Sequence, residues 1–130
     1  ERNKKEGEAL LAKNKGAKGV KTTASGLQYK ILTAGKGKKP GPEDTVTVNY
    51  RGTLIDGTEF DSSYKRGQPA SFPVKGVIRG WTEALQLMSV GARWRIDCPP
   101  QLAYGERGAG AAIGPNTVLV FEIHLIAIKD

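Results

Sequence analysis

The feature that most limits the possible folds of this sequence is a change in its hydrophobic period. The stretch VIRGWTEALQLM (residues 77–88) has apolar residues at i, i+3, i+4 and i+7, which are Trp81, Ala84, Leu85 and Met88. That spacing predicts one short amphipathic helix. On both sides of it, apolar and polar residues alternate with period two, which is typical of half-buried strands. One helix among several strands favours an α+β fold, with the helix covering one face of an antiparallel sheet.

The alternating stretches define the expected strands, which are Leu27–Ile31, Val46–Tyr50, Ala92–Cys98 and Val118–Ile128. The pair Asp56-Gly57 predicts a hairpin between Leu54 and Phe60. In the third strand we expect Trp94, Ile96 and Cys98 to point into the core and Arg93, Arg95 and Asp97 to point outward. In the fourth strand, His124 falls on the face away from the core. We therefore expect it to be an exposed strand residue without a catalytic role.

The 130 residues are enough for one domain with a hydrophobic core, preceded by a basic tail. Residues 1–14 look helical and residues 16–25 read as a linker, which divides the chain into a tail at 1–24 and a domain at 25–130. Residue 1 is Glu and the sole methionine is Met88, so we expect a processed or truncated chain that has lost any targeting segment. No apolar run approaches the roughly 20 residues of a membrane span.

The net charge of +7 is concentrated in the amino-terminal part of the chain. Residues 1–40 hold eleven Lys or Arg and three Glu, whereas residues 41–130 hold nine Lys or Arg and ten Asp or Glu. A basic segment of this kind can contact nucleic acid or anionic lipid, although a solvated polar helix end is the more ordinary interpretation. No aromatic residue lies among these lysines before Tyr29, so we expect no nucleic-acid partner.

Cys98 is the sole cysteine, which excludes a disulfide within the chain and a thiolate zinc site. We interpret it as a small core residue. We expect neither a metal nor a cofactor.

Four segments of the sequence resemble the FK506-binding protein (FKBP) type of peptidyl-prolyl cis-trans isomerase. They are VTVNYRGTLIDGTEFDSS (residues 46–63), VIRGWTEALQLMSVG (77–91), LAYGERG (102–108) and IGPNTVLVFEIHLI (113–126). The amino-terminal stretch from residue 4 to residue 32 is similar to the junction found in the bacterial macrophage infectivity potentiator (Mip) group. The resemblance implies a twisted antiparallel sheet wrapped around one short helix, with the amino-terminal helical segment left from a longer helix.

The resemblance also implies the reaction, which is rotation about the peptide bond that precedes proline. The barrier is about 18–20 kcal/mol because the planar amide has partial double-bond character. No bond is broken, so the enzyme needs no nucleophile, metal or strong base. A site that binds the proline ring, excludes water and favours the twisted amide is sufficient. A twisted amide is less dipolar than a planar one, so an apolar, ring-lined pocket is the expected design.

Six of the nine aromatic residues match the family's pocket. By resemblance, the catalytic set is Tyr50, Phe60, Asp61, Trp81, Tyr104 and Phe121, with Trp81 as the floor under the proline ring. The substrate-binding set is Phe72, Val77, Ile78 and Ile113. The backbone N–H of Ile78 and the hydroxyl of Tyr104 are the expected hydrogen-bond donors to substrate. The loop GERGAGAAIGPN (residues 105–116) is expected to form a flap, which Ala109 and Ala112 make small.

Alternatives stay open for several of these residues. Asp61 can instead cap a turn through the backbone N–H groups that follow it. Phe60 and Phe121 have the strand phase of ordinary core residues. For the whole chain, the leading hypothesis is an active prolyl isomerase that assists folding. There are two alternatives. The chain is a binding or chaperone module, or its basic amino-terminal segment contacts a partner or an anionic surface.

The resemblance implies partners and a compartment as well. Proline-containing polypeptides are the expected substrates, and macrolides such as FK506 or rapamycin the expected inhibitors. The Mip group leads us to expect a full-length homodimer formed through a preceding amino-terminal domain, with this fragment monomeric. The expected location is the periplasm or the outer membrane, and the cytoplasm is the alternative.

Overall fold

The computed structural model describes residues 2–109 and 113–129. Its elements, in chain order, are α1 (Arg2–Lys15), β1 (Val20–Thr22), β2 (Gln28–Thr33), β3 (Thr45–Thr53), β4 (Glu59–Ser62), α2 (Ser63–Arg66), β5 (Ala70–Pro73), η1 (Val74–Gly76), α3 (Arg79–Leu87), β6 (Arg93–Cys98), η2 (Pro100–Leu102), η3 (Gly105–Arg107) and β7 (Leu119–Lys129). The strands form one antiparallel sheet in the order β1-β2-β6-β7-β3-β4, and β5 pairs with β3. This arrangement confirms the predicted α+β class.

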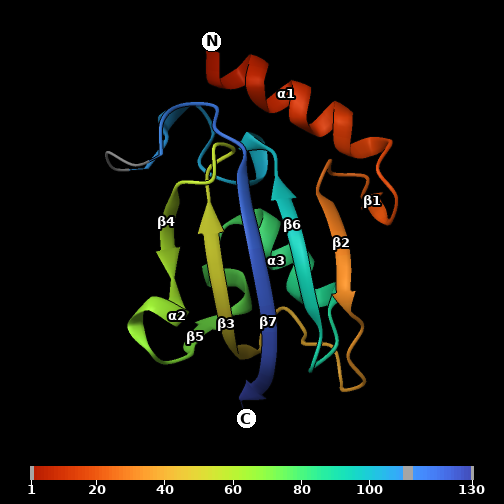
Figure 1. Cartoon of the computed structure of the whole chain (residues 1–130). Coiled ribbons are helices and arrows are strands. Elements are labelled where there is room, and N and C mark those ends of the chain that lie inside the picture. Colours follow the sequence, from red (N-terminus) through yellow and green to blue (C-terminus); the bar gives the residue numbers. More distant parts are fainter. Residues whose placement is uncertain (1, 110–112, 130) are drawn as a thin grey trace.

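The helix α3 packs against the inner face of the sheet, which curves around it (Figure 1). Its apolar face is the predicted one, since Trp81 is 4% exposed and Ala84, Leu85 and Met88 are fully buried. The alternating residues Leu119, Phe121, Ile123 and Leu125 of β7 are buried on the sheet side of the same core. Burial of each large aliphatic side chain contributes about 1.5–3 kcal/mol, so this contact between α3 and the sheet holds the domain together.

The predicted hairpin joins β3 to β4 at Asp56-Gly57. Gly57 has φ +91°, a conformation that favours glycine, and the Leu54 N–H donates to the Thr58 carbonyl at 2.9 Å. The turn also receives a hydrogen bond at 2.9 Å from the Thr58 N–H to Asp56 Oδ1. The bounds of the short strand β5 were not predicted, because only four residues separate Pro69 from η1, too few for alternation to identify a strand.

The amino-terminal segment is more closely joined to the domain than a tail and linker would be. Residues 20–22, within the predicted linker, form β1 and pair with β2 from Val20↔Lys30 to Thr22↔Gln28. α1 crosses one end of the sheet (Figure 1), and its Gly7 is buried against Val118. The proposed division of the chain at residue 24 stays a prediction.

Two predictions about the side-chain pattern were wrong. Asp97 was expected to face solvent, but it is 5% exposed because Asn14 of α1 covers it and donates a hydrogen bond to its carboxylate. Ile31 was expected to face the core, but it is 41% exposed near the end of β2, beyond the reach of the short strand β1. No helix among the described residues is both long enough and apolar enough to cross a membrane.

Candidate active site

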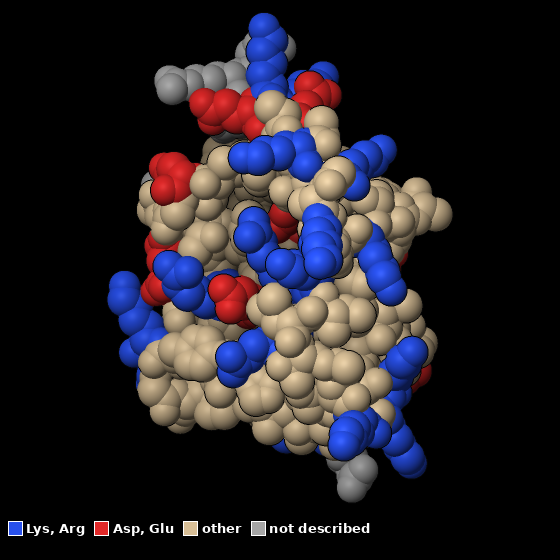
Figure 2. Space-filling view, turned by 45° about the vertical axis from the view of Figure 1, so that its right-hand side comes forward, with Lys and Arg blue, Asp and Glu red and all other residues tan. Residues whose placement is uncertain are grey.

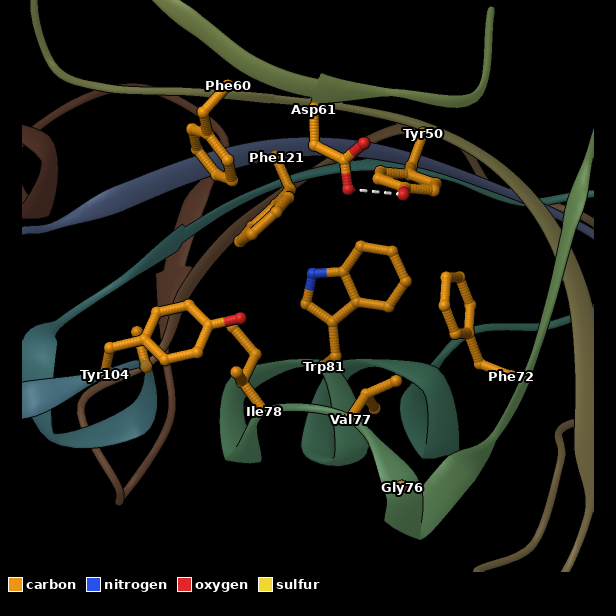
Figure 3. A pocket seen from close by; sticks show the side chains of 11 residues that line it. Tyr50, Phe60, Asp61, Phe72, Gly76, Val77, Ile78, Trp81, Tyr104 and Phe121 are labelled. Carbon is orange, nitrogen blue, oxygen red and sulfur yellow. Dashed lines mark hydrogen bonds between the residues drawn. The ribbon is translucent and has the colours of Figure 1, made fainter. Parts of the chain in front are cut away.

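Trp81 occupies the floor of the candidate site because the first turn of α3 lies very close to β6. Gly80 makes this approach possible, since a Cβ at that position would lie 2.5 Å from Cys98 Sγ and 3.4 Å from the Leu102 carbonyl oxygen. The indole therefore projects from the start of the helix toward the inner face of the sheet (Figure 3). This geometry explains why a bulky ring directly follows a glycine at the start of the helix.

Three other rings stand edge-to-face around the indole. Their centroids lie 5.1 Å away for Tyr50, 5.6 Å for Phe72 and 5.3 Å for Phe121, with interplanar angles of 84–86°. Phe60 extends this group by packing at 82° against Phe121, at 5.6 Å. These rings come from β3, β4, β5 and β7, so the sheet and α3 together fix their positions. Aromatic pairs favour this geometry, which rigidifies the walls.

The rings enclose a cavity of about 480 Å³. Its lining residues are Tyr50, Phe60, Asp61, Phe72, Gly76, Val77, Ile78, Trp81, Ala103, Tyr104 and Phe121. Nine of the ten residues predicted for the site thus surround one cavity, although their roles in catalysis stay predictions. Gly76 and Ala103 were not predicted, although they directly precede the predicted residues Val77 and Tyr104. Their adjacency in sequence was the available signal.

Ile113 is the predicted site residue that does not belong to this lining. It is 6% exposed, lies in the hydrophobic core, and its backbone pairs with Ala109 through hydrogen bonds of 2.8 and 3.2 Å. Its proposed contact with substrate therefore rests on the resemblance alone. Ala112, which was expected to make the flap small, lies outside the described residues.

The polar side of the cavity is a closed network formed by Tyr50, Asp61 and Arg66. The Tyr50 hydroxyl donates to Asp61 Oδ2 at 2.6 Å (Figure 3). The Arg66 guanidinium donates to Asp61 Oδ1 at 2.6 Å and to the Tyr50 hydroxyl oxygen at 2.8 Å. The guanidinium carbon also lies 5.5 Å from the centroid of the Tyr50 ring. Asp61 therefore holds the Tyr50 ring in place from one side, and Arg66 holds both groups.

Arg66 reaches this position because the sequence SSYKRG folds into the single turn α2. The Ser62 side chain caps the turn by accepting from the Lys65 N–H at 3.3 Å, and Gly67 ends it with φ +76°. Arg66 was not predicted as a site residue, because its contact with Tyr50 spans 16 residues and follows no local pattern. The turn interpretation of Asp61 also holds in part, since Asp61 Oδ1 accepts from the Ser62 N–H at 2.9 Å.

The network fixes the protonation states of its members. Burial alone would raise the pKa of Asp61, but hydrogen bonds from Tyr50 and Arg66, together with the guanidinium charge, outweigh it and lower that pKa. Burial and the hydrogen bond to Asp61 raise the pKa of Tyr50. At neutral pH, Asp61 is therefore a carboxylate and Tyr50 a neutral phenol. A carboxylate held in this way has little tendency to take up a proton from a substrate.

Two hydrogen-bond donors at the cavity are available to a ligand. Within residues 2–109 and 113–129, neither the backbone N–H of Ile78 nor the hydroxyl of Tyr104 has a hydrogen-bond partner, and Tyr104 is 42% exposed. The hydroxyl of Tyr104 points toward Trp81 and lies next to Ile78 (Figure 3). The indole Nε1 of Trp81 also lacks a partner in the described structure, but it is buried and not exposed to a ligand. The two accessible donors, of Ile78 and Tyr104, suit a carbonyl-rich ligand such as a peptide.

The residues outside the cavity behave as ordinary structural residues. Trp94 is 5% exposed and stacks on Tyr29, with ring centroids 4.3 Å apart. Cys98 is fully buried, and burial strongly raises the pKa of its thiol. His124 lies on the outer face of β7, opposite Arg93. Across the described part of the chain, no cluster of three or more His, Cys, Asp or Glu residues could hold a metal ion.

Comparison with known proteins places these features in a family. Residues 36–126 match the FKBP-type peptidyl-prolyl cis-trans isomerase family, and residues 1–31 match the domain amino-terminal to FKBP-type peptidyl-prolyl isomerase. The sequence is 60% identical to peptidyl-prolyl cis-trans isomerase Mip of Coxiella burnetii, covering 98% of this chain and 55% of that protein. It is 58% identical to outer membrane protein MIP of Legionella longbeachae, covering 99% of this chain and 55% of that protein.

Solved structures agree with this assignment. The crystal structure of FkpA from Escherichia coli superposes with a TM-score of 0.95 at 48% identity, covering 98% of this chain and 60% of that chain. A peptidyl-prolyl cis-trans isomerase from Pseudomonas syringae pv. tomato superposes with a TM-score of 0.92 at 45% identity, covering 99% and 95%. The chain thus spans about half the length of the curated relatives named above.

Proposed function

Because the chain belongs to the family of FKBP-type peptidyl-prolyl cis-trans isomerases, we propose that it catalyses rotation of the peptide bond that precedes proline in polypeptides. The observation that carries this proposal is the cavity of about 480 Å³, which has an indole floor and walls of aromatic rings. A proline ring fits a flat aromatic floor, and the walls exclude water from the amide that precedes the proline. The hydrogen-bond donors of Ile78 and Tyr104 then bind the carbonyl groups of the substrate.

The mechanism follows from the polarity of the cavity. A planar amide is strongly dipolar, and it loses part of that dipole as it twists and its resonance is interrupted. Transfer to an apolar site therefore raises the free energy of the planar ground state more than that of the twisted state, which lowers the barrier between them. In this proposal Trp81, Phe60, Phe72 and Phe121 provide the apolar surface. Asp61 acts as a positioning residue that keeps Tyr50 in place.

A peptide assay with the change Tyr104→Phe tests the proposed role of the loop donor. The loss of one hydrogen bond, worth about 0.5–1.5 kcal/mol, should lower kcat/KM by roughly two- to twelvefold while the cavity keeps its shape. Tyr64→Phe is the matched control, since Tyr64 is 52% exposed on α2 and does not line the cavity. An equal change in both variants, or no change in either, would contradict the proposed placement of the donor.

A second assay tests the floor of the site with Trp81→Leu. Leucine keeps the position apolar but removes the flat surface, so we expect kcat/KM to fall severalfold more than in Tyr104→Phe. Inhibition of the unaltered chain by FK506 should compete with the peptide for the same cavity. Absence of any isomerase activity in the unaltered, folded chain would overturn the proposed function.

We extend the proposal to the setting in which the protein works. Names of relatives such as outer membrane protein MIP support a location in the periplasm or at the outer membrane. By its resemblance to the Mip group, we propose that the full-length protein is a homodimer and that residues 1–130 alone are monomeric; residues 1–31 match a domain that precedes the isomerase domain in this family. Light scattering of the full-length protein and of residues 1–130 tests the two oligomeric states. Fractionation of cells tests the compartment.

A further inference from the structure

The outer face of the sheet, on the side away from α3, carries a group of exposed basic side chains. In the strand register, Lys30 of β2 lies opposite Arg95 of β6. Arg93 precedes Arg95 by two residues on β6, which places it on the same face. Lys18 lines the same small hollow as Lys30 and Arg95. We call Lys18, Lys30, Arg93 and Arg95 the basic face. Figure 2 shows Lys and Arg side chains gathered around a hollow on this side of the molecule.

Few acidic groups compensate these charges. Asp97 is 5% exposed, lies under Asn14 of α1, and is paired with Arg95 at 3.3 Å. Glu122 lies between two arginines in the register, opposite Arg95 on one side and Arg51 on the other. Among the carboxylates that the structure describes, none forms an ion pair with Lys18, Lys30 or Arg93. The face therefore keeps a net positive charge.

One exposed aliphatic side chain adjoins this charge. Leu32 lies at the register shift between Ile31 and Thr33, where Thr33 pairs with Arg93, and it is 45% exposed. Ile31 is 41% exposed, but it lies opposite Trp94 in the register and so has the phase of the other face of β2. Both lie beyond the pairing with β1, which ends at Val20↔Lys30, so the edge of β2 is uncovered at this point. Basic groups with adjacent aliphatic side chains are the combination that peripheral proteins present to a bilayer surface.

The choice between an anionic bilayer and a nucleic acid follows from the aromatic residues. Single-stranded nucleic acids bind to exposed rings on which their bases can stack. Trp94 is buried, and Tyr29 lines the same small hollow as Lys30 and Arg95, but the two rings already stack on each other at an interplanar angle of 6°. The basic face thus offers cations and an aliphatic group, with its one adjacent ring already stacked, which favours lipid headgroups.

We propose that the basic face binds the anionic headgroup surface of a lipid bilayer, with Leu32 at the boundary. The cavity around Trp81 lies on the inner side of the sheet, next to α3. Binding through the outer face leaves that cavity open to solvent and to substrate chains. The surface thus holds the isomerase at a membrane while its catalytic site faces away.

Sedimentation of the chain with vesicles tests this proposal. The vesicles contain phosphatidylglycerol and phosphatidylcholine, and vesicles of phosphatidylcholine alone are the neutral comparison. Each Lys or Arg close to an anionic surface contributes roughly fivefold to binding, so the double change Lys30→Gln and Arg93→Gln should weaken partitioning roughly thirtyfold. Binding should also decrease as salt is raised, because exposed charges are screened over about 10 Å at 0.1 M.

The matched control is Lys65→Gln with Lys75→Gln, which removes the same charge elsewhere. Their side chains are 81% and 63% exposed, in α2 and η1. We expect this control to bind as the unaltered chain does, and peptide isomerisation to be unchanged in both double variants, which separates this proposal from the proposed activity. Equal weakening in both variants, absence of binding to anionic vesicles at low salt, or binding to duplex DNA in preference to vesicles would overturn the proposal.

Discussion

The change Gly52→Ala tests whether the packing of the cavity walls controls activity. Gly52 lies in β3, opposite Asp61 of β4 and Phe121 of β7, on the face that carries Tyr50. A Cβ at this position would lie 2.7 Å from Phe60 Cζ and 2.9 Å from Phe121 Cε1. The backbone at Gly52 is not in the left-handed region, so the substitution adds bulk without local backbone strain. It therefore displaces two rings without deleting either.

The size of the effect follows from these distances. Carbon atoms in contact prefer a separation of about 3.5–4.0 Å, so the Phe60 ring must retreat by about 0.8 Å or more. Overpacking of this kind costs about 1–3 kcal/mol, and the reduced entropy of the unfolded chain offsets about 0.4–1 kcal/mol. We expect a net loss of about 1–2 kcal/mol, which lowers Tm by roughly 3–8 °C.

Activity should respond more strongly than stability. Phe121 packs against Trp81 at 5.3 Å, so its displacement disturbs the floor of the cavity. A misplacement of about 1 Å can cost up to about 100-fold in rate, and we expect kcat/KM to fall by about tenfold. The peptide assay is run well below Tm, so that unfolding makes no contribution.

Gly41→Ala is the control for Gly52→Ala, since its Cβ would lie at an ordinary 3.6 Å from Asp44 Oδ2. We expect that variant to keep its activity and to keep or slightly raise its Tm, because the reduced entropy of the unfolded chain is not offset by a clash. If Gly52→Ala retained full kcat/KM and an unaltered Tm, the aromatic rings of the cavity wall would be loosely packed. The argument that ring placement governs the reaction would then be refuted.

Three further predictions concern the charged network and the buried thiol. Arg66→Leu should raise the pKa of Asp61, since the guanidinium now lowers it, and should loosen the Tyr50 ring; a carboxyl titration by NMR measures the shift. Because the folded-state pKa of Asp61 is lowered, its contribution to stability is present above its unfolded pKa of about 3.9 and is lost as pH falls through the folded value. In Asp61→Asn, the unfolding free energy measured by urea denaturation should therefore decrease less steeply as the pH falls below about 4. An unchanged pH dependence of that free energy would contradict this. Cys98 should react with Ellman's reagent only after denaturation, because its thiol is buried and its pKa is raised; rapid labelling of the native chain would contradict the described packing.

The local pattern of the sequence was sufficient for the main elements. Alternation in residues 118–128 identified the longest strand and its buried face, because side chains in a strand point to opposite sides with period two. The helical spacing from Trp81 to Met88 identified the face of α3 that packs on the sheet. The Asp56-Gly57 pair identified a hairpin, because glycine readily adopts the positive φ that such a turn requires.

The sequence also indicated which rings belong together, but only through resemblance to a family. Periodicity placed Phe121 on the core face of its strand, where it would have been indistinguishable from Ile123. Its position against Trp81 depends on how β7 lies across the sheet from α3. Trp81 and Phe121 are 40 positions apart in the sequence, so no local pattern predicts that their rings are in contact.

Tertiary structure alone decided the environment of the charged groups. Asp97 has the strand phase of an exposed residue, yet α1 covers it, so its burial depends on a helix that lies 83 positions away in sequence at Asn14. Arg66 was equally unpredictable, because the turn at residues 62–67 returns its guanidinium to Tyr50 and Asp61. Period and turn chemistry are properties of neighbouring residues and can be read along the chain. Burial and charge pairing are properties of space, and they are fixed only when distant segments pack together.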